Sequence, residues 1–209
     1  MTQQRGNRRE LLAEAAIEVL AKEGGRGLTH RAIDRAARVP EGTTKNYYPN
    51  RSALFEAIAH YLAERHTAAL EELCDQIPED LRPEEVTALY AAMLRRMSGS
   101  AQTQFLALFE LHLEGVRNPE VRKMLGEISR ANVDTAVRLH SAVGRRISVR
   151  GAGLLDAGML GVALATLSLP DDLVGELGFG DPEATSRALL TLARARGESS
   201  LEVLRDSAS

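Results

Sequence analysis

Apolar residues recur every three or four positions along most of the chain, and no stretch shows the period of two that is typical of a strand. Short groups of Gly, Pro and Asp separate the apolar stripes. The pattern therefore predicts an all-α fold of about nine helices. The predicted helices cover residues 9–23, 29–37, 41–48, 51–76, 83–97, 103–117, 119–147, 153–168 and 182–196.

The two short helices near the N-terminus follow the first long one closely. Thr29 is a good N-cap for the first of them, and Pro49 stops the second. The apolar residues here can pack both short helices against the first helix, leaving the second exposed along one side. That is the requirement of a helix-turn-helix, in which a supported helix enters the major groove of DNA. The packing residues are Leu28, Ile33, Ala36, Ala37 and Val39.

The predicted reading helix, Glu41 to Tyr48, carries side chains suited to a groove about 12 Å wide. Small residues at its start allow close approach, threonines can contact a thymine methyl or a phosphate, and the amide of Asn46 can pair with adenine. Glu41 either favours the positive end of the helix or accepts a hydrogen bond from cytosine. The candidate DNA-binding residues are Thr29, Arg31, Glu41, Gly42, Thr43, Thr44, Lys45, Asn46, Tyr47 and Arg51. The alternative is two short surface helices of a bundle without DNA binding.

Charge is distributed unevenly along the chain. Residues 1–51 carry a formal charge of +4 and the rest carry −7, within a total of −3. A basic head on an acidic body is typical of a DNA-binding segment joined to a segment that does not bind DNA.

Other features indicate a cytoplasmic protein. The single Cys74 cannot form an intrachain disulfide, and no Cys/His pair has the spacing of a zinc site. The N-terminal residues form an amphipathic pattern and not the apolar core of a signal peptide. The most apolar run, 151–169, contains Asp156, which leaves 14 uncharged residues from Ala157 to Pro170. Because about 20 are needed to cross a bilayer, we interpret the run as a buried helix.

The body of the chain carries three apolar stripes that include a few polar residues. Polar groups in an apolar setting need partners, and small-molecule sites combine apolar walls with a few convergent polar groups. For each such residue, the alternative is a core group that already has its partner. The candidate ligand-binding residues are Tyr90, Met93, Phe105, Phe109, His112, Asn132 and Thr135.

The stretch LTHRAIDRAARVPEGTTKNYYPNRSALF, from Leu28 to Phe55, resembles the TetR family of transcriptional repressors. The matching residues are Ala32, Ala36, Val39, Gly42, Thr43, Tyr47 and Leu54, and the first helix with Ala15, Ala16 and Gly24 also fits. The resemblance covers about a quarter of the chain.

The resemblance implies a three-helix DNA-binding domain at 1–51 and a helical-bundle domain for ligand binding and dimerisation at 52–209. It also implies a small-molecule effector, a double-stranded DNA operator that is near-palindromic, and a homodimer through the helices at 153–168 and 182–196. Small residues in the first of these helices, Gly158 and Gly161, permit close packing.

The motif departs from the family pattern in its turn. Arg38 stands where the family usually has Gly, and if it is left-handed the strain costs on the order of 1 kcal/mol. Pro40 replaces the usual Ser cap, which makes Val39 an unusual N-cap. Lys45 replaces the common Tyr and Arg51 the common Lys.

An enzyme is a poor fit because the sequence has no HExxH motif, nucleophile elbow or phosphate loop. We expect no catalytic residue, no metal site and no cofactor. Two other functions remain open beside a ligand-released repressor: a helical protein-interaction module, and a TetR-like activator without small-molecule induction. DNA affinity that falls steeply with salt would separate a regulator from an interaction module.

Overall fold

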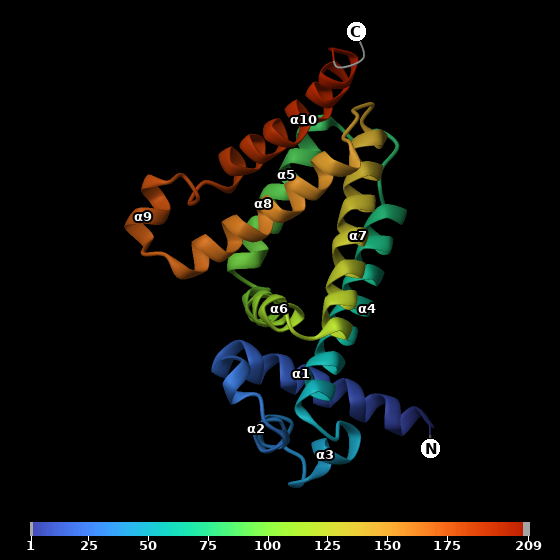
Figure 1. Cartoon of the computed structure of the whole chain (residues 1–209), viewed down its shortest axis with the longest axis vertical. Coiled ribbons are helices and arrows are strands. Elements are labelled where there is room, and N and C mark those ends of the chain that lie inside the picture. Colours follow the sequence, from blue (N-terminus) through green and yellow to red (C-terminus); the bar gives the residue numbers. More distant parts are fainter. Residues whose placement is uncertain (1, 207–209) are drawn as a thin grey trace. The chain divides into compact units, whose positions relative to one another are not determined.

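The computed structural model describes residues 2–206, and within them it contains ten helices and no strand, which confirms the all-α prediction. Side chains are described for residues 7–194. The helices, labelled in Figure 1, are α1 Thr2–Gly27, α2 His30–Ala36, α3 Thr43–Tyr47, α4 Arg51–Asp75, α5 Pro83–Ser98, α6 Gln102–Gly115, α7 Pro119–Ala142, α8 Val149–Ser168, α9 Asp171–Glu176 and α10 Pro182–Asp206.

Several helices differ from the sequence prediction: α3 is shorter, α7 ends earlier at Ala142, α8 begins earlier at Val149, and α9, α10 and α1 differ as follows. Helix α9 is the additional one, and it is too short for its apolar period to stand out; Asp171 and Asp172 lie in its first turn, where a helix favours negative charge. Helix α10 continues through Gly197 to Asp206, because one glycine costs a helix only about 1 kcal/mol. Helix α1 begins at Thr2 and is interrupted at Gly24, where φ is 67°.

The chain forms two compact units. The first contains residues 1–67 and 101–128, and the second contains residues 68–100 and 129–209. Helices α4 and α7 each contribute residues to both units. This grouping follows packing and does not test the functional boundary between residues 51 and 52, which stays a prediction.

The first unit is organised around α1, which packs against α2 and α6 (Figure 1). Helix α2 in turn packs against α3. One face of α1 is buried, as are Leu28 before α2 and Ile33 within it, whereas Ala36, which the sequence predicts as a packing residue, is exposed. The larger side chains of this core are Leu12, Ile17, Leu20, Leu28, Ile33, Leu54, Phe55, Ile58, Leu111 and Met124.

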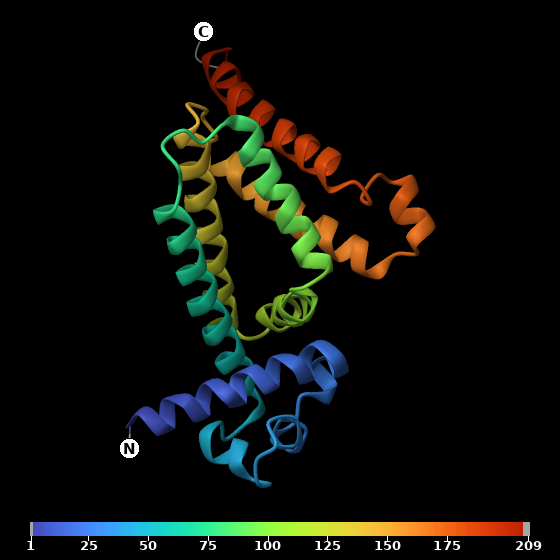
Figure 2. The ribbon, with the colours of Figure 1, turned by 180° about the vertical axis from the view of Figure 1, so that it is seen from behind.

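The second unit is built on α5, α8 and α10, which pack pairwise and lie side by side in both ribbon views (Figure 2). Glycine allows α8 to approach α10 closely: a Cβ at Gly151 would lie 2.3 Å from the carbonyl oxygen of Ala193. By length and composition α8 could also cross a membrane. A core helix meets the same criteria, and α8 packs against both α5 and α10.

Candidate nucleic-acid interface

Helix α2 begins at His30 because Thr29 caps it, as the sequence predicts. The Oγ1 atom of Thr29 accepts a hydrogen bond from the backbone N–H of Ala32 (3.2 Å). This bond satisfies one of the amides that a helix leaves unpaired in its first turn. Thr29 is itself exposed, so its contact with a phosphate stays a prediction.

The turn after α2 is the strained one that the sequence indicates. Arg38 has a φ of 53°, in the left-handed region that is costly for a residue with a Cβ. Two backbone hydrogen bonds close the turn, from the N–H of Arg38 to the oxygen of Arg35 (3.2 Å) and from the N–H of Val39 to the oxygen of Asp34 (3.0 Å).

The reading helix α3 is shorter than predicted. It runs from Thr43 to Tyr47, and the residue before it, Gly42, has a φ of 89°. Because a left-handed residue cannot continue a right-handed helix, Pro40 and Glu41 belong to the turn. The N-cap is therefore Gly42, and the expectation of Val39 as the N-cap was wrong. A Cβ at position 42 would have no atom within 4 Å, so there is space for a side chain here. Glycine is favoured at this position because of its positive φ.

A buried carboxylate, that of Asp34 in α2, holds the start of α3. Its Oδ2 accepts a hydrogen bond from the N–H of Gly42 (2.8 Å). Its Oδ1 accepts two more, from the N–H of Thr44 (2.8 Å) and from the Thr44 hydroxyl (2.6 Å). Asp34 is 3% exposed and Thr44 is 0% exposed. Asp34 thus performs the capping function that the sequence sought at Val39, but from the preceding helix.

The charge state of Asp34 follows from these contacts. Burial alone would raise its pKa, but the hydrogen bonds from Thr44 and Gly42, together with the nearby His30, hold the pKa below its ordinary value. Asp34 is therefore ionised at neutral pH and accepts from all three donors. A carboxylate in this position also favours the positive end of α3.

The exposed side of α3 carries Lys45 and Asn46. Thr43 and Tyr47 are partly buried, and the Thr43 hydroxyl donates a hydrogen bond to the oxygen of Pro40 (2.6 Å). Thr44 is buried against Asp34, so its side chain cannot reach a base or a phosphate as the sequence analysis expected. The reason is geometric, since it occupies the inward face of a short helix.

Arg31 and Glu41 form an ion pair, with 2.7 Å between Nε and Oε1. Both side chains are mostly exposed, so the pair contributes little to stability. Its effect is local: Glu41 offsets the charge of an arginine beside α3. Neither of the two roles that the sequence left open for Glu41 includes this pairing.

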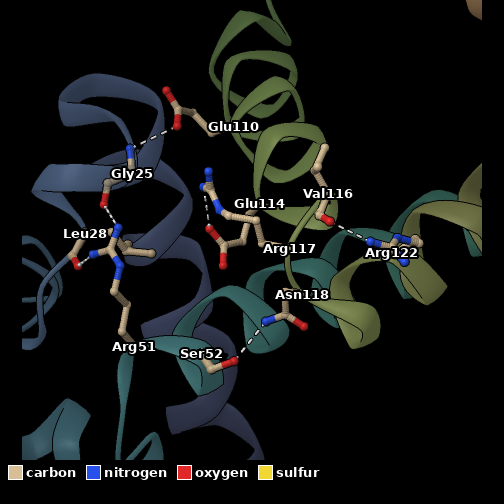
Figure 3. Close-up of polar contacts among 10 residues, drawn as sticks. All are labelled: Gly25, Leu28, Arg51, Ser52, Glu110, Glu114, Val116, Arg117, Asn118 and Arg122. Carbon is tan, nitrogen blue, oxygen red and sulfur yellow. Dashed lines mark hydrogen bonds and ion pairs between the residues drawn. The ribbon is translucent and has the colours of Figure 1, made fainter.

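The guanidinium of Arg51 is used inside the protein. It donates to the carbonyl oxygen of Leu28 (3.0 Å) and to that of Gly25 (Figure 3). Its Cζ atom also lies over the ring of Phe55, 5.0 Å from the centroid. The sequence predicts a phosphate contact for Arg51 because Arg51 and Thr29 stand on either side of the reading helix. A planar guanidinium with several donors can instead fasten the α1–α2 connection to α4.

Helix α6 and the residues after it hold the end of α1 and the start of α4. The Glu110 carboxylate accepts a hydrogen bond from the N–H of Gly25 (3.0 Å), and the Asn118 amide donates one to the hydroxyl of Ser52 (2.9 Å) (Figure 3). Arg122 donates to the carbonyl oxygens of Gly115 (2.9 Å) and Val116 (2.6 Å) and closes the α6–α7 turn. Helix α6 is therefore fastened to the DNA-binding helices within the first unit.

The predicted ligand-binding residues are divided between the units. Phe105, Phe109 and His112 lie on α6 in the first unit. The second unit contains Tyr90, Met93, Asn132 and Thr135. Periodicity places each of these residues on a helix face but does not establish which helices surround one cavity.

Three of the predicted polar residues differ from expectation. His112 is exposed and does not lie within an apolar face. The Asn132 amide donates to the Asp156 carboxylate (2.7 Å), and the buried Thr135 hydroxyl accepts from the Cys74 thiol (3.9 Å). Asn132 and Thr135 thus have partners within the protein, as the alternative interpretation held.

A second set of buried polar residues contains one predicted ligand-binding residue, Tyr90, and three residues that were not predicted, His140, Ser186 and Arg194. Over the described residues, no hydrogen-bond partner is present for the Tyr90 hydroxyl, both ring nitrogens of His140, the Ser186 hydroxyl or Nε of Arg194. His140 is 0% exposed, and its ring stacks on that of Tyr90 with centroids 6.2 Å apart. A usable signal was present in the sequence, because His140 follows the apolar residues Val133 and Ala136 at the helical spacings of seven and four.

The second unit also contains a pocket of about 750 Å³ between the end of α4, the following loop and α5. Its walls are mainly apolar, with charged residues at its edge. The volume lies in the usual range for small-molecule sites. The apolar lining consists of Leu73, Ile77, Pro78, Leu81, Ala88, Leu89, Ala92 and Leu139.

The helices that the resemblance assigns to a dimer expose large apolar side chains. Leu154 and Leu164 of α8 are 44% and 46% exposed, and Leu192 of α10 is 66% exposed. Gly158, by contrast, packs within the chain, because a Cβ there would lie 2.7 Å from Leu189. Over the described residues, no group of three or more His, Cys, Asp or Glu side chains could hold a metal ion.

Several solved structures are similar to this chain over most of its length. Among solved structures, the multidrug binding protein EbrR complexed with imidazole is 26% identical with a TM-score of 0.57, covering 88% of this chain and 94% of that one. Its complex with ethidium is 22% identical with a TM-score of 0.62, covering 88% and 98%. A TetR-family member from Streptomyces coelicolor A3 is 25% identical with a TM-score of 0.62, covering 88% and 97%.

No curated protein sequence matches the chain. The family described as "Tetracyclin repressor-like, C-terminal domain" matches residues 81–195, which is more than half of the chain. This match lies outside the N-terminal motif and is independent of it. With a helix-turn-helix in the first unit and this C-terminal match, the chain belongs to the TetR family of DNA-binding transcriptional regulators.

Proposed function

We propose that this protein is a repressor that binds a near-palindromic operator as a homodimer and is released by a small molecule. The observation that carries the proposal is the Asp34 cap, which fixes α3 so that Lys45 and Asn46 remain exposed. A reading helix that is rigid before binding loses little conformational freedom on DNA.

Fewer residues are proposed to contact DNA than the ten that the sequence predicts. Lys45 and Asn46 reach the groove, with Gly42, Thr43 and Tyr47 at its edge and Thr29 near a phosphate. Lys45 supplies charge, and the Asn46 amide can recognise adenine. Arg31 serves as a phosphate contact once Glu41 has released it, while Thr44 and Arg51 serve the packing of the motif.

The exposed leucines of α8 and α10 support a homodimer. Leu154, Leu164 and Leu192 would be buried between two copies of these helices, which are the pair that the family resemblance assigns to the interface. A two-fold dimer recognises two half-sites about 34–36 Å apart, or a multiple of this.

The regulatory part of the proposal concerns the second unit. EbrR, a structural relative, has been solved with imidazole and with ethidium, and the pocket of about 750 Å³ would accommodate a molecule of comparable size. Release follows by linkage if the effector binds the DNA-incompetent conformation more tightly than the DNA-binding one. Helices α4 and α7, which belong to both units, would transmit the change, and the Glu110–Gly25 contact would carry it to the motif.

The test is a selection of genomic DNA fragments by the purified full-length protein, followed by sequencing. We expect enrichment of one inverted-repeat motif, with gel-shift affinity that falls steeply as salt rises. Lack of an enriched motif, or affinity independent of salt, would favour the interaction-module alternative. Transcription in vitro from the selected promoter then separates repression from activation.

Dimerisation is tested by Leu192→Arg in sedimentation experiments. A charge at a buried apolar interface is costly, so we expect monomers and loss of operator binding. Leu113→Arg is the matched control, because Leu113 is equally exposed (63%) but lies on α6, outside the proposed interface. A dimer that persists in Leu192→Arg contradicts the proposed interface.

A further inference from the structure

The unpartnered polar residues of the second unit come from three helices. Tyr90 belongs to α5, His140 to α7 and Arg194 to α10. The rings of Tyr90 and His140 are stacked, and the charge of Arg194 acts on both of them. These three side chains therefore form one cluster, which we call the polar cluster.

The polar cluster is unusual because native proteins pair nearly all buried polar atoms. Here the Tyr90 hydroxyl, both nitrogens of His140 and Nε of Arg194 are buried with no hydrogen-bond partner among the described residues. Each such group costs about 1–3 kcal/mol relative to a paired one. A cluster of several is typical of a site that a ligand completes.

The chemistry of the polar cluster points to an acceptor. Arg194 offers only donors, the Tyr90 hydroxyl donates, and a neutral imidazole donates from one nitrogen. The charges acting on His140 come from Arg194 and Arg145. Neither arginine forms an ion pair over the described residues. A ligand oxygen with negative charge would supply what all three side chains lack.

The net charge of the polar cluster indicates the charge of the ligand group that it would bind. Burial, with help from Arg194 and Arg145, lowers the pKa of His140 to about 4, so its ring is neutral at pH 7. Burial raises the pKa of the Tyr90 hydroxyl, which keeps its proton. Arg194 is then the single charged member, and it matches one negative charge, as on a carboxylate.

We propose that the effector is a small organic acid whose carboxylate binds Arg194, His140 and Tyr90 while its apolar part packs in the second unit. The proposal rests on the proposed function only in calling this ligand the effector. Carboxylate oxygens accept in plane from the guanidinium, and the hydroxyl and imidazole complete the site.

The test uses three acids, benzoate, 2-naphthoate and decanoate, each beside its neutral amide. Calorimetric titration of the full-length protein is expected to show at least one acid binding at least about tenfold more tightly than its amide, the size of a hydrogen bond to a charged group. If no acid is preferred to its amide, the proposal is overturned. If 2-naphthyl phosphate binds more tightly than 2-naphthoate, the assignment to a carboxylate is overturned.

Variants of the polar cluster test whether the acid binds there. Arg194→Gln should weaken the acid at least about tenfold and leave the amide unchanged. Arg187→Gln, an exposed arginine on the same helix, is the matched control and should change neither. Tyr90→Phe keeps the ring and should also weaken the acid, so the test does not depend on the folding of one variant. An acid affinity unchanged in Arg194→Gln and in Tyr90→Phe would place the acid elsewhere and overturn the proposal.

A gel-shift experiment with the selected operator separates this inference from the proposed function. If the protein binds its operator and no acid is preferred, only the acid site fails. If an acid binds through Arg194 but no operator is found, the repressor assignment fails and the acid site stands. If both bind, the acid should release the DNA from the wild type at concentrations that leave Arg194→Gln bound; release at the same concentration in both overturns its role as effector.

Discussion

Two buried polar groups, the Asp34 network of the first unit and the polar cluster of the second, differ in whether they have hydrogen-bond partners. In the first, the Asp34 carboxylate accepts three hydrogen bonds of 2.6–2.8 Å, and Thr44 is bonded through both its amide and its hydroxyl. In the second, Tyr90, His140 and Arg194 have buried polar atoms that no described residue contacts by a hydrogen bond. The Asp34 network has its partners within the chain, whereas the polar cluster has none among the described residues.

This difference teaches how the two tasks are divided. A satisfied buried network is rigid and specifies one geometry, which suits a helix that must meet a groove in a fixed orientation. Unsatisfied groups lower stability, and proteins retain them mainly at functional sites. We therefore expect deletions of polar groups to have large effects in the first unit and small ones in the second.

The largest expected effect comes from Asp34→Ala. It leaves two amides and one hydroxyl without their acceptor, and we expect the free energy of unfolding to fall by about 3 kcal/mol. Operator binding should be lost together with the cap on α3. Urea unfolding followed by circular dichroism, with gel shifts, measures both. Asp34→Asn is the control; it keeps one acceptor oxygen and should lose less stability. Equal losses in both variants would show that the carboxylate does not act through these bonds.

The same carboxylate predicts a dependence on pH. Because the pKa of Asp34 is lower in the folded protein than in the unfolded chain, its contribution is fully present above the unfolded value near 4. It is lost as pH falls through the lower, folded pKa. Wild-type stability should therefore fall more steeply below about pH 4 than that of Asp34→Asn. Parallel curves for the two proteins would contradict this account.

Lys45→Ala sharpens the comparison by removing a side chain that we propose to contact DNA and that supports no packing. Lys45 is exposed, so stability should stay within about 0.5 kcal/mol. We expect operator affinity to fall about tenfold and the slope of affinity against salt to decrease by about 1. Lys22→Ala, an exposed lysine on α1, is the matched control. If both variants weaken binding equally, only overall charge matters and α3 is not the reading helix.

A smaller change in the free energy of unfolding is expected at Arg38, where the backbone of the first unit is strained. Arg38→Gly removes the Cβ that makes a φ of 53° costly, and we expect a gain of about 0.5–1 kcal/mol after the greater flexibility of glycine in the unfolded chain is counted. Arg38→Ala keeps the Cβ and should give no gain. Chemical unfolding of the wild type, Arg38→Gly and Arg38→Ala measures these stabilities. A gain in Arg38→Ala would mean that the arginine side chain, and not the backbone conformation, is unfavourable.

The sequence predicts the helices and the strained turn, because apolar period and backbone preference are local properties. It does not predict the start of α3, which depends on Gly42 adopting a left-handed conformation, or the cap from Asp34, which bonds to residues eight and ten positions away. The candidate ligand-binding residues are harder still to predict. His112 and His140 both lie on amphipathic helices, and only packing shows that the first is exposed and the second is 0% exposed.

The smallest expected effect contrasts most directly with that of Asp34. Tyr90→Phe removes a buried hydroxyl that has no hydrogen-bond partner over the described residues. The free energy of unfolding without ligand should therefore stay the same or rise by up to about 1 kcal/mol. Tyr61→Phe is the matched control in the first unit, because the Tyr61 hydroxyl donates to Glu14 and accepts from Arg65 (2.9 Å); it should lose about 0.5–1 kcal/mol. A loss at Tyr90 as large as that at Tyr61 would mean that water already satisfies the hydroxyl, and the contrast between the two units would not extend to this residue.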